Sequence, residues 1–85
     1  MTQSTRDVVI AALHKSIGLL NDGAHAPSIL AGNDIEFSRI EIDSLDLFEV
    51  IMEIEDRLGL QLDADDVAAQ PSLHALVDFL DQKRV

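Results

Sequence analysis

The stretch that decides the fold is residues 44–59, which read SLDLFEVIMEIEDRLG. Strong helix formers fill it, and its final glycine readily takes the left-handed conformation at a helix end. We therefore expect a helix over Ser44–Leu58 with Gly59 as its cap. At about 100° per residue, five aliphatic side chains fall on one face of this helix and predict a core stripe. They are Leu47, Val50, Ile51, Ile54 and Leu58.

Further helices are predicted on both sides of this stretch. Ser4, three residues before Asp7, can cap a helix that begins near Thr5, and the turn residues at 21–23 would end it. Ser72 can cap a final helix. Apolar residues recur at helical spacing in both helices. They are Val9, Leu13, Ile17 and Leu20 in the first, and Leu73, Leu76, Val77 and Leu80 in the last.

The segments between these helices are less regular. Asp63 and the acids after it predict a short helix through Ala69, which Pro71 prevents from continuing. Residues 24–42 show no clear period and predict a long loop, with a short helix over 27–30 as the alternative. Five apolar residues would pin this loop to the core. They are Ile29, Leu30, Ile35, Phe37 and Ile40.

Together these elements predict an all-α protein. Three principal helices and one short helix would form a four-helix bundle, with the long loop between the first and second helices. Because 85 residues suffice for one core only, we expect a single domain over residues 1–85. The fold class does not by itself indicate a function, because helical bundles have many activities.

Composition narrows the range of functions. The chain has no cysteine, so any thiol chemistry would need sulfur from a cofactor. Its formal net charge of -10 disfavours nucleic acids and membrane insertion and favours basic protein surfaces as partners, although acidity can also serve solubility alone. No apolar run reaches the roughly 20 residues of a membrane span, and the first residues lack the features of a signal peptide. We therefore expect a cytoplasmic location.

A second apolar strip runs along the helix expected at 44–58. It consists of Leu45, Phe48 and Met52, beside the core stripe. Glu49, Glu53 and Asp56 border it, in a region that has seven acids between Glu41 and Asp56 and no base. Either both stripes are buried, or this strip is exposed and binds basic partner proteins.

Ser44 stands where the long loop meets this helix, in the sequence Asp43-Ser44-Leu45-Asp46. A hydroxyl near a helix N-terminus is well placed to carry a phosphate, since the partial positive charge of the helix favours an anion there. The alternative is that Asp43 or Ser44 only caps the helix. Four residues alone favour the cap.

The chain as a whole resembles the acyl carrier protein family, whose attachment motif is Asp-Ser-Leu at the start of its second helix. The resemblance covers nearly the full length, including 43–46, 48–59 and the final helix over 73–80 after a short acidic third helix. It implies an acyl-carrier-like four-helix bundle in which a transferase attaches 4'-phosphopantetheine from coenzyme A to Ser44. The thiol of that arm then carries acyl groups as thioesters, which supplies the sulfur that the chain lacks.

The resemblance also implies roles for the neighbouring residues. Asp43 matches the residue before the serine that takes part in the modification. Leu45, Phe48 and Met52 match the family's partner-recognition strip, and Asp46 stands at the start of that helix beside them. Glu49, Glu53 and Asp56 match its acidic contact positions. The expected partners are a phosphopantetheinyl transferase and acyl-loading, ketosynthase-type and acyltransferase enzymes with basic docking surfaces, acting on a monomeric carrier.

The chain also departs from the family pattern before Ser44. Where the family often has Leu-Gly, this chain has Ile40-Glu41, and Arg39 replaces the usual acid. These differences indicate a specialised set of partners rather than a housekeeping role in fatty acid synthesis. Fatty acid, polyketide and specialised lipid pathways all stay open. The aliphatic core further suggests that an acyl chain of medium length can enter among Val50, Ile54, Leu62 and Val77.

Three other functions compete with an acyl carrier. A peptidyl or aminoacyl carrier would share the fold and the serine, and an unmodified helical module would use the acidic strip for docking alone. An enzyme is the remotest alternative, because His14, His25 and His74 are scattered and no catalytic residue is predicted. No metal site is predicted either, since the acidic run from Asp63 has Ala68 where a calcium loop needs glycine.

Overall fold

The structure is a computed structural model that describes residues 4–21 and 23–84. Within this part of the chain it contains five α-helices, two 3-10 turns and no strands. The elements are α1 (Thr5–Ile17), η1 (Leu19–Asn21), α2 (Ala26–Leu30), η2 (Phe37–Arg39), α3 (Ser44–Leu58), α4 (Ala64–Ala68) and α5 (Leu73–Lys83). The all-α prediction is confirmed, with α1, α3 and α5 as the principal helices. The expected short helix is α4, and the short helix that was only an alternative within the long loop is also present, as α2.

The beginning of α1 follows the sequence prediction, but its end does not. Ser4 caps the helix by accepting a hydrogen bond from the Asp7 backbone N–H at 3.1 Å. The helix stops at Ile17, because Gly18 takes the left-handed conformation (φ 66°) and donates its N–H to the His14 carbonyl. The expected stop at 21–23 was therefore wrong, and Leu20 lies in η1 rather than in α1. Asp22, which belonged to that expected stop, lies outside the described residues.

The segment over residues 24–42, which was expected to be a long loop, has little regular structure but is held by hydrogen bonds to the rest of the protein. It includes α2, which begins at the predicted Pro27 region, and η2. Leu73 N–H donates to the Ile35 carbonyl and Phe37 N–H to the Pro71 carbonyl, both at 2.9 Å. These bonds join the segment to the start of α5 and explain how so long a connection fits a small domain.

Side chains of the same segment differ from the prediction in one respect. Ile29 and Ile35 are buried, and Phe37 and Ile40 pack partly buried against the core, as expected of residues that pin a loop. Leu30 was expected to do the same, but it is exposed. The five-residue helix α2 has room for only one inward side chain of this pair, and Ile29 takes that place.

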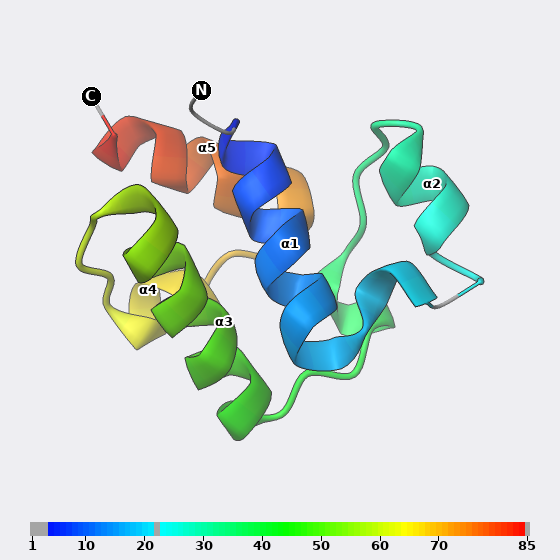
Figure 1. The fold of residues 1–85 in the computed structure, drawn as a ribbon, viewed down its shortest axis with the longest axis horizontal. Coiled ribbons are helices and arrows are strands. Elements are labelled where there is room, and N and C mark those ends of the chain that lie inside the picture. Colours follow the sequence, from blue (N-terminus) through cyan, green and yellow to red (C-terminus); the bar gives the residue numbers. More distant parts are fainter. Residues whose placement is uncertain (1–3, 22, 85) are drawn as a thin grey trace.

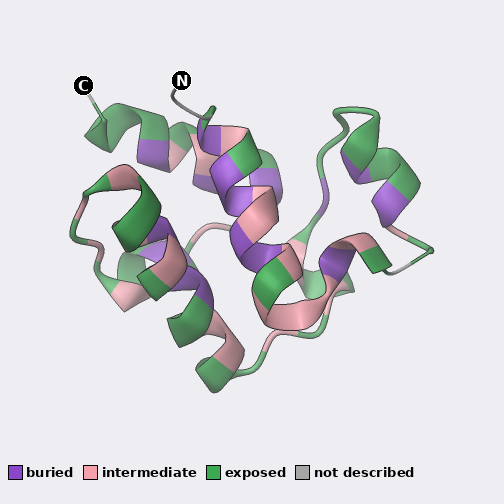
Figure 2. Cartoon of the chain, viewed as in Figure 1, coloured by how far each residue is buried: buried purple, intermediate pink, exposed green. Residues whose placement is uncertain are grey.

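The core lies where α1, α3 and α5 meet (Figure 1). The buried positions form inward stripes on these helices, while the outer faces are exposed (Figure 2). Thr5, at the start of α1, donates a hydrogen bond to Asp81 and accepts one from Arg84 at 2.7 Å. The first turn of α1 is thereby joined to the last turns of α5, and the loop that leads to Ser44 lies at the other end of the molecule.

Candidate functional site

The start of α3 gives Asp43 and Ser44 different roles. The Asp43 carboxylate accepts a hydrogen bond from the Asp46 N–H at 2.8 Å, so Asp43 is the N-cap of the helix. Ser44 is the first helical residue and is exposed. Its hydroxyl makes no side-chain hydrogen bond within the described part of the chain. The helix cap therefore does not use Ser44. The Ser44 hydroxyl has no structural role in these contacts.

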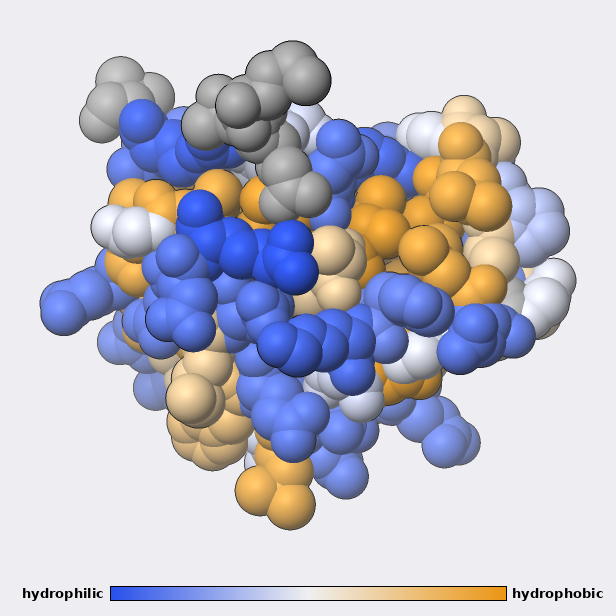
Figure 3. Space-filling view, in the orientation of Figure 1, coloured by the Kyte–Doolittle hydropathy of each residue, from blue (hydrophilic) through white to orange (hydrophobic). Residues whose placement is uncertain are grey.

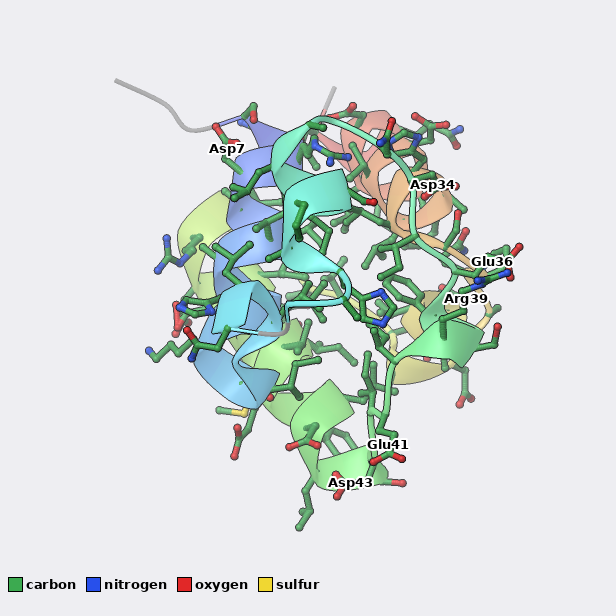
Figure 4. The ribbon with its side chains drawn as sticks, turned by 90° about the vertical axis from the view of Figure 1, so that its right-hand side faces the viewer. Asp7, Asp34, Glu36, Arg39, Glu41 and Asp43 are labelled. Carbon is green, nitrogen blue, oxygen red and sulfur yellow. The ribbon has the colours of Figure 1, made fainter. Side chains whose placement is uncertain are left out.

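The surroundings of the Ser44 hydroxyl favour an anion on the side of the helix but not on the side of the preceding loop. The N–H groups of Ser44 and Leu45 belong to the first turn of a helix, where backbone donors lack partners inside the helix. The carboxylates of Glu41 and Asp43 lie at the same end of the molecule, where the loop enters α3 (Figure 4). A phosphate on Ser44 would thus find backbone donors on the helix side and negative charge on the loop side.

The second apolar strip of α3 is exposed. Leu45, Phe48 and Met52 are 74%, 56% and 62% exposed, whereas Val50, Ile51 and Ile54 on the core face are buried. One stripe of α3 therefore belongs to the core, and the other is an exposed apolar patch of the kind found at protein interfaces. We call Leu45, Phe48 and Met52 the docking strip. Of the two alternatives that the sequence left open, burial of both stripes is therefore excluded, and the role of the docking strip in binding stays a prediction.

The acids beside the docking strip are not equivalent. Glu49 and Asp56 are exposed, and Glu49 is 3.3 Å from the Ser16 hydroxyl, which donates to it. Asp46 is half-buried, and its N–H is taken by the cap. Glu55 has a structural contact instead, because it accepts a hydrogen bond from the Leu62 N–H at 2.8 Å. Asp56 is exposed, and its carboxylate makes no hydrogen bond or ion pair in the part of the chain that the structure describes.

Glu53 differs most from the simple picture of an acidic docking residue. Its carboxylate lies 2.6 Å from Lys15 Nζ and 3.0 Å from Arg57 Nε. Hydrogen bonds from Lys15 and Arg57 lower the pKa of the Glu53 carboxyl below its ordinary value. Lys15 comes from α1, so the sequence pattern of α3 could not reveal this pair. A basic partner that uses Glu53 has to compete with two cations of the protein itself.

An apolar pocket opens between the principal helices close to Ser44 in sequence. Its volume is about 250 Å³, and ten residues line it. They are Leu13, Phe37, Ile40, Ile42, Leu47, Val50, Val67, Ala68, Gln70 and Leu76. Ile42 and Leu47 stand two residues before and three residues after Ser44, so one wall of the pocket begins beside the serine.

The predicted path of an acyl chain corresponds only in part to this pocket. Of the four expected residues, Val50 lines it and Ile54, Leu62 and Val77 do not. Ile54 is completely buried in the packed core, where no space is left. The loop residues Phe37, Ile40 and Ile42, together with α4, supply the wall that the helix pattern alone did not show.

Comparison with known protein families identifies the chain. The family model described as phosphopantetheine attachment site matches residues 23–80, more than half of the sequence. The chain belongs to the phosphopantetheine attachment site family. This carrier domain takes 4'-phosphopantetheine as its covalent cofactor. Searches of curated proteins and of solved structures found no match.

Membership sets the general role of this carrier domain. Domains of the family are in general carriers rather than catalysts, and they interact with phosphopantetheinyl transferases and biosynthetic enzymes. The whole of α3 falls inside the matched residues, as do all residues that line the apolar pocket except Leu13. None of the helices described here is long and apolar enough to cross a membrane.

Proposed function

We propose that the protein is an acyl carrier and that Ser44 carries the phosphopantetheine arm. The observation that supports this most directly is that Asp43 and Ser44 have different roles at the start of α3. Asp43 caps the helix, which leaves the exposed Ser44 hydroxyl available for modification. The alternative that the serine is only a cap loses its basis, because the neighbouring carboxylate fulfils that role.

The residues around Ser44 fit the group that it would hold. The first-turn N–H groups of Ser44 and Leu45 can donate to phosphate oxygens. Asp43 and Glu41 give the hydroxyl negatively charged surroundings, which a basic transferase site can match. When bound, the arm supplies a terminal thiol that carries acyl groups as thioesters, in a chain without cysteine.

The docking strip would guide partner enzymes to the arm. Its three apolar side chains lie on the helix that Ser44 begins, and the exposed acids Glu49 and Asp56 can steer a basic surface. Asp46 and Glu53 belong to the same proposed surface, with Glu53 available once Lys15 and Arg57 are displaced. We propose a phosphopantetheinyl transferase and acyl-loading, ketosynthase-type and acyltransferase enzymes as its partners.

The apolar pocket favours acyl groups over aminoacyl groups as cargo. Its volume of about 250 Å³ is several times the ~30 Å³ that one water molecule occupies in the liquid. Aliphatic side chains and Phe37 dominate its walls, so an alkyl chain gains hydrophobic stabilisation there and a charged amino acid does not. We therefore place the carrier in fatty acid, polyketide or related specialised lipid synthesis rather than in peptide synthesis.

The remaining properties belong to the same proposal. The carrier is a substrate of enzymes and not an enzyme itself, acts as a monomer in the cytoplasm, and forms a single domain over residues 1–85. Among the histidines, the Nδ1 of His14 accepts a hydrogen bond from the Leu20 N–H at 3.2 Å, at the turn between α1 and η1. That contact gives His14 a structural task.

Intact-mass spectrometry tests the attachment site. The protein is incubated with coenzyme A and a promiscuous phosphopantetheinyl transferase, and the expected result is one added arm that Ser44→Ala abolishes. Ser38→Ala is the matched control, since Ser38 is another exposed serine six residues earlier and should leave the adduct in place. The absence of any adduct refutes the proposed site and favours an unmodified interaction module. An adduct that survives Ser44→Ala refutes Ser44 as the attachment site and places the arm on another residue.

A further inference from the structure

A second apolar surface lies away from the docking strip, in a groove between α1 and α2. The groove has a volume of about 690 Å³, and Ile10, Ala11, Leu20 and Leu30 contribute apolar walls. Leu30 is 73% exposed, which places it among the most exposed large apolar side chains described. Figure 3 shows the apolar side chains of this region gathered at the upper right and bordered by hydrophilic ones.

Basic residues surround this groove in an otherwise acidic protein. Arg6, Lys15 and Arg57 line it, and Asp7 is the one carboxylate among the described lining residues. Three of the chain's six Lys and Arg residues therefore meet at one groove. Lys15 and Arg57 are paired with Glu53, so the three cations at the groove face two carboxylates, Asp7 and Glu53, and keep a small excess of positive charge in a chain of net charge -10. This local excess favours an anionic ligand, which has to compete with Glu53 for Lys15 and Arg57.

Arg6 adds a hydrogen-bond donor without a partner. Its Nη2 donates to the Ile29 carbonyl at 2.8 Å and to the Asn33 carbonyl at 3.1 Å, which ties the end of α2 to α1. Its Nη1 is buried and has no hydrogen-bond partner in the described structure. Because a buried donor without an acceptor is unfavourable, a carboxylate that enters beside Leu30 would stabilise this guanidinium.

We infer that this groove is a second docking site, which binds an acidic amphipathic helix of a partner protein. The lining residues of α1 run from Arg6 to Lys15, about 14 Å at the rise of an α-helix. That length accommodates anchors at i, i+4 and i+7 of a bound helix, the usual arrangement of a helix in a groove. Aspartate or glutamate on the flanks of that helix meets the basic rim.

A partner protein suits the groove better than a second copy of the chain. The docking strip of another copy is also apolar and acidic, but a copy that placed its strip in this groove could no longer present that strip to the enzymes of the proposed function. The groove contains neither Ser44 nor a residue of the docking strip. A partner held there would leave both free for enzymes, so the groove would tether the carrier while the arm is in use.

NMR titration of the ¹⁵N-labelled, unmodified full chain tests this site without any transferase. The probe is a capped synthetic helix with leucines at i, i+4 and i+7 and glutamates on both flanks, and the control peptide has lysine in place of every glutamate. The glutamate peptide should shift the amides of Ile10, Ala11, Leu30 and Gly32. Higher salt should weaken its binding, and the lysine peptide should not shift these amides.

Variants and the protein alone complete the test. Leu30→Asp should weaken the glutamate peptide about tenfold, as the loss of one aliphatic anchor and an added repulsion imply. Leu30→Ala should weaken it less, and Gln61→Asp, which adds the same charge at an exposed loop position, should not. Equal binding of both peptides, or no shift at the groove, overturns the inference. Groove shifts caused by concentrating the protein alone would also overturn it, by identifying a second copy as the occupant.

Discussion

Replacing Phe48 by alanine separates docking from folding. Phe48 is 56% exposed, so a partner enzyme can bury at most that fraction of its side chain. Full burial of such a side chain contributes about 1.5–3 kcal/mol, and the exposed fraction therefore corresponds to about 0.8–1.7 kcal/mol. If a transferase buries Phe48 completely, Phe48→Ala should lower kcat/KM for arm attachment roughly 4- to 18-fold.

The assay is the initial rate of arm attachment at limiting carrier concentration, followed by mass spectrometry. Leu30→Ala is the matched control, because Leu30 is also largely exposed but lies outside the docking strip. Phe48→Ala should keep the helical circular dichroism and lose only a few degrees of melting temperature, since less than half of the side chain is buried. The reasoning is refuted if Phe48→Ala is modified as fast as the parent, or if Leu30→Ala slows modification equally.

Three further predictions concern charge, pH and the pocket. Asp56→Asn should slow loading by a basic partner enzyme more than Glu53→Gln does, because cations of the protein already neutralise Glu53; equal effects in the same rate assay would contradict this. Burial raises the pKa of Asp34, but hydrogen bonds from the backbone N–H of His74, the Ser72 side chain and the Ile35 N–H outweigh it and hold the pKa below the ordinary 3.8. The ionised Asp34 thus stabilises the fold above pH 3.8 and loses this effect as the pH falls through its lower folded value. Asp34→Ala should therefore melt at lower temperature than the parent near neutral pH and converge with it in strong acid; a constant difference would refute the assignment. Ala68→Phe should fill the apolar pocket, so that attaching an acyl chain no longer shifts the methyl resonances of Val50 and Val67; unchanged acyl-dependent shifts would show that the chain lies elsewhere.

Local sequence rules predicted most of the helical framework correctly. The spacing of apolar residues, the caps at Ser4, Ser72 and Gly59, and the start of a short helix at Asp63 depend on contacts between near neighbours in the chain, and each is present in the structure. The prediction of where α1 ends failed because two glycines, Gly18 and Gly23, follow the helix and either could end it. Gly18 does so, since the His14 carbonyl and imidazole both accept hydrogen bonds from the turn that follows. The sequence offered no means to choose between the two glycines.

The candidate site shows the same division. The order Asp43-Ser44 and the separate strip of Leu45, Phe48 and Met52 on α3 could be read from the sequence, because the geometry of one helix determines them. The exposure of that strip depends on how the other helices pack against α3, so the sequence left it open. Single-domain organisation and the roles of these residues in binding stay predictions. Lys15 beside Glu53, the walls of the apolar pocket and the basic groove with Leu30 at its edge could not be read in this way. Each joins residues far apart in the chain, and only the packing of α1 against its neighbours brings them together.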